Sequence, residues 1–467
     1  MMKKAQPSFS FSNKLAACAD PCMDCDMAMA LFEGFCFHTC TLEMREGREN
    51  TFLIGTPRSL PQIPERSEYA ILIDDLGAAV VGRDHASLLR GYMALLLKIE
   101  PVSGEQGVFA MATGLEHSAF TVRNRMIHLC VFPETSYLFL KKLVRLCGVL
   151  QYTHVVLEFW GMLKFDCEPA LAWPMAFTKE QAREVIREIR ALGMEPIPMF
   201  NHLGHASACR VNAGKHVVLD QNPTLYDLFT PDGWSWNTQS PTVWELLKAV
   251  RHELYELFGE GAYFHAGLDE SYMHAKSPAY FSLLPDFLAR LTEEIVREGR
   301  RPMIWMDMFL PEEAYVEQRM HACTKGKTPA ACEAVLSRLA KETVLIDWHY
   351  SVDHAPVPTA IYLLGKGFDI MGAPWFDAKN IAAYVETAKT TDLFGVMETT
   401  WHTAAHDMYN MLYFARLCGA AKAPWSDYSG PKEETATLLR KVTFEPHDYA
   451  EAGWMREQIN LGAAKMC

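Results

Sequence analysis

Two adjacent carboxylates, Asp269 and Glu270, are the sharpest chemical feature of the sequence. They close a short apolar run over residues 263–270 that is typical of a buried strand, so both side chains are expected at a strand end. Repulsion between neighbouring carboxylates raises the pKa of one of them, which can then stay protonated and act as a general acid. The alternative interpretation is a solvated acidic turn without chemical use.

Other apolar runs end in residues of the same chemical kind. They supply further carboxylates, imidazoles and aromatic rings: Glu158, Asp307, Glu398, His205, His265, Trp305, Trp348, Tyr350, Trp375 and Trp401. Indole rings stack on the C–H face of a pyranose, and carboxylates hold hydroxyls and perform acid/base work. The joint pattern predicts a sugar site, although each residue alone also fits a core position or a helix N-cap.

Eight apolar runs, separated by longer helical patterns, must position these residues. The runs cover residues 126–132, 154–160, 195–201, 263–270, 302–308, 343–350, 368–375 and 393–401. One intervening helix is predicted over 178–192, with Thr178 as its N-cap and Gly193 as its stop. This α/β alternation predicts a (β/α)8 TIM barrel, whose function gathers at the carboxyl ends of its strands. A doubly wound sheet is the competing fold, but no G-x-G-x-x-G opens a helix after the first strand.

The sequence further predicts four parts along the chain. Residues 1–50 are expected to be an irregular segment that contains Cys, and residues 51–120 a small α/β domain with strands at 68–75 and 77–82 and a helix at 85–99. The catalytic barrel is assigned to residues 121–425, and a C-terminal helical extension to residues 426–467.

Composition limits the partners of the protein. Of 467 residues, 49% are hydrophobic and 22% charged, which is globular composition. The net charge of −13 argues against nucleic acid or an anionic membrane as the main partner. No stretch has the apolar length of a membrane span, and residues 1–20 do not read as a signal peptide. We therefore expect a cytoplasmic protein with reduced thiols, and leave a homo-oligomer open.

Over roughly residues 65–420 the sequence resembles glycoside hydrolase family 20, the β-N-acetylhexosaminidases. The family's strand-4 signature, His-x-Gly-Gly-Asp-Glu, stands here at residues 265–270 with Leu268 in place of the second Gly. Its strand-3 Gly-His is matched by Gly204 and His205, and the Arg that opens its first barrel strand by Arg125. The departures indicate a divergent member. Cys130 replaces a strand-1 Asp, and the strand-7 Tyr that holds the acetamido oxygen reads Trp375 or Phe376, with Tyr350 as a candidate substitute.

The resemblance implies removal of a terminal β-linked N-acetylhexosamine, GlcNAc or GalNAc, from a small oligosaccharide or glycoconjugate. Glu270 would protonate the glycosidic oxygen and later activate water, while the substrate's own acetamido oxygen attacks C1. Asp269 would orient the acetamido N–H, Arg125 would hold ring hydroxyls, and His205 would support the acid. Trp305, Trp348 and Trp401 would enclose the sugar, and neither a cofactor nor a metal is implied.

Two other functions remain open for the same barrel. A retaining β-glycosidase acting on a sugar without an acetamido group would need a protein nucleophile, for which Glu398 and Asp307 are the candidates. A non-catalytic carbohydrate-binding barrel would also account for the altered signature.

A separate possibility concerns the N-terminal cysteines. Cys18, Cys22 and Cys25 have the spacing C-x3-C-x2-C and are followed by Cys36 and Cys40. Such thiolates can hold an iron–sulfur cluster or zinc. The alternative is a loose segment with free thiols, since no strand pattern precedes Cys18 as it would in a radical enzyme.

Overall fold

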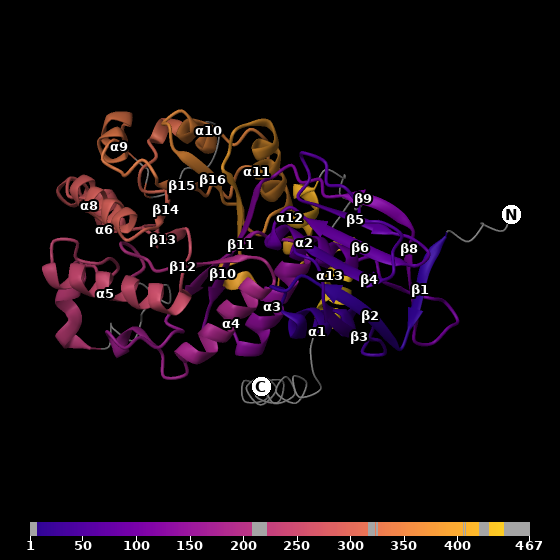
Figure 1. Ribbon diagram of the computed structural model, residues 1–467. Helices are drawn as coiled ribbons and strands as arrows, with labels where there is room; N and C mark the ends of the chain where they lie inside the picture. Colours follow the sequence, from indigo (N-terminus) through magenta and orange to yellow (C-terminus); the bar gives the residue numbers. More distant parts are fainter. Residues whose placement is uncertain are drawn as a thin grey trace, which may run out of the picture.

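The computed structural model describes residues 7–207, 222–315, 323, 326–404, 406, 408–419 and 429–442. An N-terminal sheet domain lies beside a closed eight-stranded barrel, and the helices of the barrel surround its strands (Figure 1).

The N-terminal domain is built on a six-stranded sheet with the order β3-β2-β4-β6-β5-β9 and a three-stranded sheet with the order β1-β8-β7. The strands are β1 (Ser8–Ser12), β2 (Lys14–Ala19), β3 (Thr41–Glu46), β4 (Thr51–Gly55), β5 (Tyr69–Ile73), β6 (Gly77–Gly82), β7 (Glu100–Pro101), β8 (Val108–Ala112) and β9 (Gly114–His117). Helix α1 (Cys25–Phe35) packs against β3, and α2 (His85–Leu96) packs against β5 and β6.

The prediction that residues 1–50 are irregular was wrong. Strand β1 pairs with β8, and β2 pairs with both β3 and β4, so this segment is part of the sheets. Phe9 and Phe11 alternate with exposed serines in β1, as a half-buried strand requires. The strands are short and their partners lie far along the chain, so tertiary pairing decides their structure more than local pattern does.

The barrel confirms the predicted (β/α)8 fold preceded by a small α/β domain. All eight strands are parallel, and β10 pairs with β17 to close the ring. The strands are β10 (Asn124–Val131), β11 (His154–Phe159), β12 (Glu195–Met199), β13 (Tyr263–Gly267), β14 (Arg301–Trp305), β15 (Val344–Asp347), β16 (Asp369–Gly372) and β17 (Gly395–Thr399).

Helices follow the strands and cover the outside of the ring. They are α3 (Tyr137–Val149), α4 (Lys179–Ala191), α5 (Pro241–Phe258), α6 (Tyr272–Lys276), α7 (Pro278–Phe281), α8 (Leu284–Arg297), α9 (Pro329–Leu336), α10 (Pro358–Leu364), α11 (Ala378–Thr390) and α12 (Met408–Cys418). Short 3-10 turns are η1 (Pro169–Leu171), η3 (Pro223–Leu228), η4 (Glu312–Ala314) and η5 (Trp401–Thr403). The predicted N-cap of α4 is present, because Thr178 and Gln181 form a capping box.

Alternate residues of the strands fill the barrel interior. One buried cluster contains Met126, Val156, Ile197, Met199, Met303, Trp305, Val344, Ile346, Met371, Ala373 and Met397. Because side chains alternate across a strand, the residues between these positions face the surrounding helices. This alternation decides which of the predicted site residues can reach the barrel axis.

Helix α13 (Ser429–Lys441) follows the barrel and packs against α12 and α1, so it joins the two parts of the molecule (Figure 1). The remainder of the predicted C-terminal extension lies outside the described residues. Among the described helices, none has the length and apolar character that crossing a membrane would require.

Candidate active site

The turn that carries Asp269 and Glu270 follows the carboxyl end of β13 and is fixed by two neighbouring strands. The side-chain oxygen of Asn201 accepts the N–H of Leu268 at 2.9 Å, and its amide group donates to Oδ1 of Asp269. Oδ2 of Asp307 accepts the N–H of Glu270 at 2.9 Å. The loops after β12 and β14 therefore hold the turn from both sides.

His205 brings the two carboxylates together. Its Nε2 lies 3.3 Å from Oδ2 of Asp269 and 3.0 Å from Oε2 of Glu270. Asp269 is 3% exposed, whereas the side chain of Glu270 keeps 25% of its surface open. Both carboxylates therefore lie against the same imidazole nitrogen.

Gly204 lets the β12 loop approach the carboxylate turn. A β-carbon at this position would lie 2.0 Å from the carbonyl oxygen of Asp269, so any larger residue would push the two loops apart. Gly204 is thus required for packing, and the residue after it, His205, lies against the two carboxylates.

Backbone strain gathers at the same end of the barrel. Four non-glycine residues there have positive φ angles: His205 (56°), Leu268 (90°), Glu270 (51°) and Trp401 (41°). Such conformations cost roughly 1–3 kcal/mol each and recur at functional sites, where the surrounding structure holds them in place.

A wall of aromatic rings lies beside the carboxylate turn. The ring of Tyr350 lies 5.0 Å from that of Trp348 and 5.3 Å from that of Trp375, and its hydroxyl oxygen accepts the indole N–H of Trp401 at 2.8 Å. Trp348 donates its indole N–H to Oδ1 of Asp307 at 3.2 Å, which links this wall to the carboxylate turn. Burial is the main cause that raises the pKa of Tyr350, and the charges of Asp269 and Glu270 add to it, so the phenol stays neutral.

Three predicted sugar ligands lie deeper than expected. His265 and Trp305 are 0% exposed and Glu158 is 2% exposed, so they offer no surface to a sugar. The ring of Trp305 packs 4.6 Å from His265 and 5.7 Å from Trp401. These residues belong to the packing beneath the site, which corrects their prediction as direct sugar contacts.

The prediction that Arg125 holds ring hydroxyls was wrong, because this residue lies at the other end of the barrel. It stands at the amino end of β10, opposite the carboxyl ends of the strands. Its guanidinium donates to the carbonyl of Val122 at 2.9 Å, lies 3.5 Å from Glu68 and covers the ring of Phe120 at 3.6 Å. An arginine that opens a strand cannot reach its carboxyl end, so Arg125 supports the domain junction.

The prediction of Glu398 as a site residue was also wrong, because side chains alternate along β17 and Glu398 lies on the face away from the barrel interior. Met397 faces the barrel interior, so Glu398 points toward the helices. Its Oε2 lies 2.5 Å from the hydroxyl of Tyr152. Burial raises the pKa of Cys147 in α3, and the charge of Glu398 adds to this shift. Glu398 is neither a sugar ligand nor a nucleophile in this arrangement.

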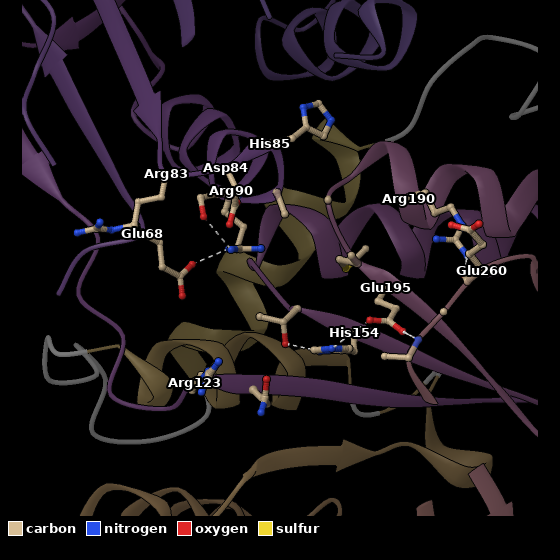
Figure 2. A pocket seen from close by; sticks show the side chains of 18 residues that line it. Glu68, Arg83, Asp84, His85, Arg90, Arg123, His154, Arg190, Glu195 and Glu260 are labelled. Atoms are coloured by element: carbon tan, nitrogen blue, oxygen red, sulfur yellow. Dashed lines mark hydrogen bonds and ion pairs between the residues drawn. The ribbon is translucent and has the colours of Figure 1, made fainter. Parts of the chain in front are cut away.

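A second hollow opens at the amino ends of the strands, between α2 and the starts of β10 and β11 (Figure 2). Several of its charged groups have partners within the protein. Arg90 pairs with Glu68 at 2.6 Å, and Arg190 donates to the carbonyl of Phe258 at 2.8 Å. Burial lowers the pKa of His154 to about 3, so that imidazole is neutral. This hollow therefore lies at the junction between the N-terminal domain and the barrel.

Sequence reasoning missed Trp234. Its indole N–H donates to the carbonyl of Glu270 at 2.7 Å, and its ring lies 4.6 Å from that of His205. It belongs to a turn after Asp232 in the loop between β12 and α5, and no strand-end pattern marks that place. The available signal was weaker, namely an indole beside an Asp-Gly turn.

Comparisons with known proteins point to one family. The family model for "Glycosyl hydrolase family 20, catalytic domain" matches residues 170–428. A comparison of the sequence with the curated proteins gave no match.

Solved structures of the same family have a similar fold. The family 20 exo-β-N-acetylglucosaminidase from Vibrio harveyi, solved with N-acetylglucosamine, has a TM-score of 0.65 at 16% identity over 95% of this chain and 76% of that chain. For the β-N-acetylhexosaminidase of Streptomyces coelicolor A3(2) the TM-score is 0.64 at 15% identity over 93% of both chains. For that of Bacteroides fragilis NCTC 9343 it is 0.62 at 13% identity over 94% of both. The family model covers more than half of the sequence and the fold agrees, so the protein belongs to glycosyl hydrolase family 20 as a divergent member.

Proposed function

We propose that the protein is an exo-acting β-N-acetylhexosaminidase that removes terminal β-linked GlcNAc or GalNAc by substrate-assisted, retaining hydrolysis. The observation that carries this proposal is the contact of Asp269 and Glu270 with one imidazole at the carboxyl end of β13. Family membership and the GlcNAc or hexosaminidase named for the similar structures support the choice of sugar.

The two carboxylates suit different roles because their surroundings differ. Glu270 is the more exposed, so it can reach the glycosidic oxygen as acid and the incoming water as base. Asp269 is buried and held by Asn201 and His205, which keeps its orientation fixed. A fixed anion is suited to holding the acetamido N–H and to stabilising the positive charge that develops on the ring-closed intermediate.

Tyr350 is the best candidate to hold the acetamido oxygen. Its hydroxyl oxygen accepts the N–H of Trp401 and makes only a long contact of 3.4 Å with the hydroxyl of Thr399, so its proton can turn to an acceptor on the substrate. The raised pKa keeps that proton in place over the working pH range. Trp348, Trp375 and Trp401 surround it and would cover the methyl group and the ring face.

A panel of nitrophenyl glycosides tests this function. Wild-type protein is expected to cleave the β-GlcNAc or β-GalNAc derivative and to leave the β-glucoside and β-galactoside nearly untouched, because only the former carry the attacking group. Equal or faster cleavage of the latter pair would overturn the proposal. Binding of GlcNAc without turnover of any member would indicate the non-catalytic barrel.

One observation keeps the conventional retaining mechanism as a second candidate. Asp307 lies within the site, where it accepts the N–H of Glu270 and that of Trp348. A 2-fluoro glycoside that labels Asp307 covalently would establish it as the nucleophile. The substrate-assisted mechanism predicts no such adduct.

A further inference from the structure

Three potential metal ligands meet inside the barrel, where no metal was expected. His128, Cys130 and Glu158 each offer one ligand atom, and these atoms all lie within 4.8 Å of one another. The residues are 0%, 4% and 2% exposed. Nε2 of His128 lies 2.8 Å from Oε2 of Glu158, and Sγ of Cys130 lies 3.7 Å from the same oxygen.

The strands hold the three side chains in place. Cys130 of β10 is directly opposite Glu158 of β11 in the strand pairing, and His128 precedes Cys130 by two residues on the same face. That face is the interior one, since Met126 and Val156 share its phase. Thr400 secures this part of β10 because its hydroxyl accepts the N–H of Cys130 at 3.3 Å and donates to the carbonyl of His128 at 3.0 Å.

The chemistry of this set fits one kind of ion. A buried carboxylate must be neutralised by a proton or by a cation. A thiolate, a carboxylate and a neutral imidazole balance a divalent cation to zero net charge. The thiolate excludes magnesium and calcium, which take oxygen ligands, and together with imidazole it favours zinc. We propose that His128, Cys130 and Glu158 bind a zinc ion within the barrel.

The geometry needs little adjustment. Zinc lies about 2.0–2.3 Å from nitrogen, oxygen and sulfur ligands in a tetrahedral arrangement. The imidazole and the carboxylate, now 2.8 Å apart, would separate to about 3.3 Å, while the sulfur-to-oxygen distance of 3.7 Å already fits. A water molecule would complete the coordination, as it does in sites with three protein ligands.

The ion is a positioning element in this account. The ring of His128 packs edge-on against Trp401 at 4.8 Å, and Trp401 is part of the aromatic wall. A zinc ion that holds His128 in place would therefore also hold Trp401 and the aromatic wall in place. Zinc binding does not depend on which sugar is cleaved, and it can be tested by metal binding and stability alone.

Zinc binding by the full-length protein provides the test. Protein stripped with a chelator and titrated with ZnCl2 is expected to bind one zinc per chain and to gain thermal stability, because a ligand of the folded state raises the melting temperature. Cys130→Ser and Glu158→Gln should each weaken zinc binding by more than about tenfold. Losing a residue that only hydrogen-bonds to a metal ligand already costs about tenfold in affinity, so losing a ligand itself should cost more. Cys147→Ser, which changes a thiol that is also fully buried beside a carboxylate, should bind zinc as wild type does.

The N-terminal cysteines are the competing ligands, and Cys22 and Cys25 are exposed. The double variant Cys22→Ser/Cys25→Ser should therefore keep the zinc. X-ray absorption of the wild-type zinc complex should report one sulfur with nitrogen and oxygen neighbours, a result that requires no variant to fold. Absence of zinc binding, several sulfur neighbours, or loss of zinc only in the double variant would each overturn the proposal.

Discussion

Glu270 differs from its neighbour by a modest amount of exposed surface, and in the proposed mechanism that difference separates the acid from the orienting group. The side chain of Asp269 is 4% exposed and that of Glu270 is 25% exposed, although both face His205. Two carboxylates in distinct surroundings are the usual way in which one site provides both an acid and an anion.

Glu270→Gln should lower kcat/KM on an unactivated disaccharide by about 10²–10⁴-fold, because the leaving oxygen is no longer protonated. A nitrophenyl leaving group needs less protonation and should suffer less. Steady-state kinetics on both substrates measures the difference, with Glu260→Gln as a control at the other end of the barrel. Equal losses on the two substrates would remove Glu270 from the role of acid.

The sequence was informative about residues at strand ends and poor about the direction of their side chains. It predicted Asp269, Glu270, His205, Trp348 and Tyr350, which the structure brings together. It failed for Glu398, where a shift of one position along β17 turns the side chain toward the helices. It also gave no weight to His128 and Cys130, although polar residues at alternate positions of an apolar strand were a usable signal.

At the scale of elements, the turn after β13 shows how strain and packing compete. Leu268 has a φ of 90°, which suits glycine, yet its side chain is 0% exposed in the core. Truncating a buried Leu costs about 2–5 kcal/mol, whereas the left-handed conformation costs about 1–2 kcal/mol. Packing therefore explains why this chain tolerates Leu where the family motif has Gly.

This competition predicts an unusual order of variants. Leu268→Gly should be at least as stable as Leu268→Ala, because glycine relieves the strain that alanine retains. At Leu247, a buried residue of helix α5, Leu→Gly should be less stable than Leu→Ala by about 1 kcal/mol. Chemical denaturation of the four variants provides the comparison. The same order at both positions would show that φ at residue 268 carries no strain.

Strand β15 ends in a buried acid that makes stability depend on pH. Burial raises the pKa of Asp347 to about 6, although Thr359 and Tyr384 donate hydrogen bonds to it. Because the folded state holds this proton more tightly than the unfolded state, the contribution is present below pH 4 and is lost as the pH rises through 6. At about 1.4 kcal/mol per pH unit, the loss is about 3 kcal/mol.

Asp347→Asn should lack this loss. Its free energy of unfolding relative to wild type should rise between pH 4 and pH 7, as measured by denaturation at both values. Taking the difference between the two proteins cancels the titration of all other groups. A constant difference across this range would contradict the assignment.

At the scale of the whole molecule, the N-terminal domain lies beside the barrel and contacts it near the start of β10 and at α3. Arg125 connects the two parts through Glu68 and the ring of Phe120. The barrel itself could be predicted from eight apolar runs with regular spacing. The strands of residues 1–50 could not, since their partners lie far away in the sequence. The predicted cytoplasmic location stays a prediction.

Arg125→Met should destabilise the protein by about 1–3 kcal/mol, because buried carbonyl groups lose their donor. In the folded protein KM for an aryl glycoside should change by less than about twofold, since the guanidinium is remote from the sugar. Thermal melting and steady-state kinetics measure the two effects. An unchanged melting temperature with a large rise in KM would restore Arg125 to the sugar site.

In the proposed mechanism the acetamido group of the substrate is the nucleophile, and Asp269 and Glu270 assist it. A series of nitrophenyl β-glucosaminides with N-acetyl, N-fluoroacetyl, N-difluoroacetyl and N-trifluoroacetyl groups tests it most directly, because each fluorine weakens the attacking oxygen and leaves the leaving group unchanged. If the acetamido oxygen attacks C1, kcat should fall steeply and steadily along the series. A kcat that stays level across the four substrates would contradict it and would point to a carboxylate of the protein as the nucleophile.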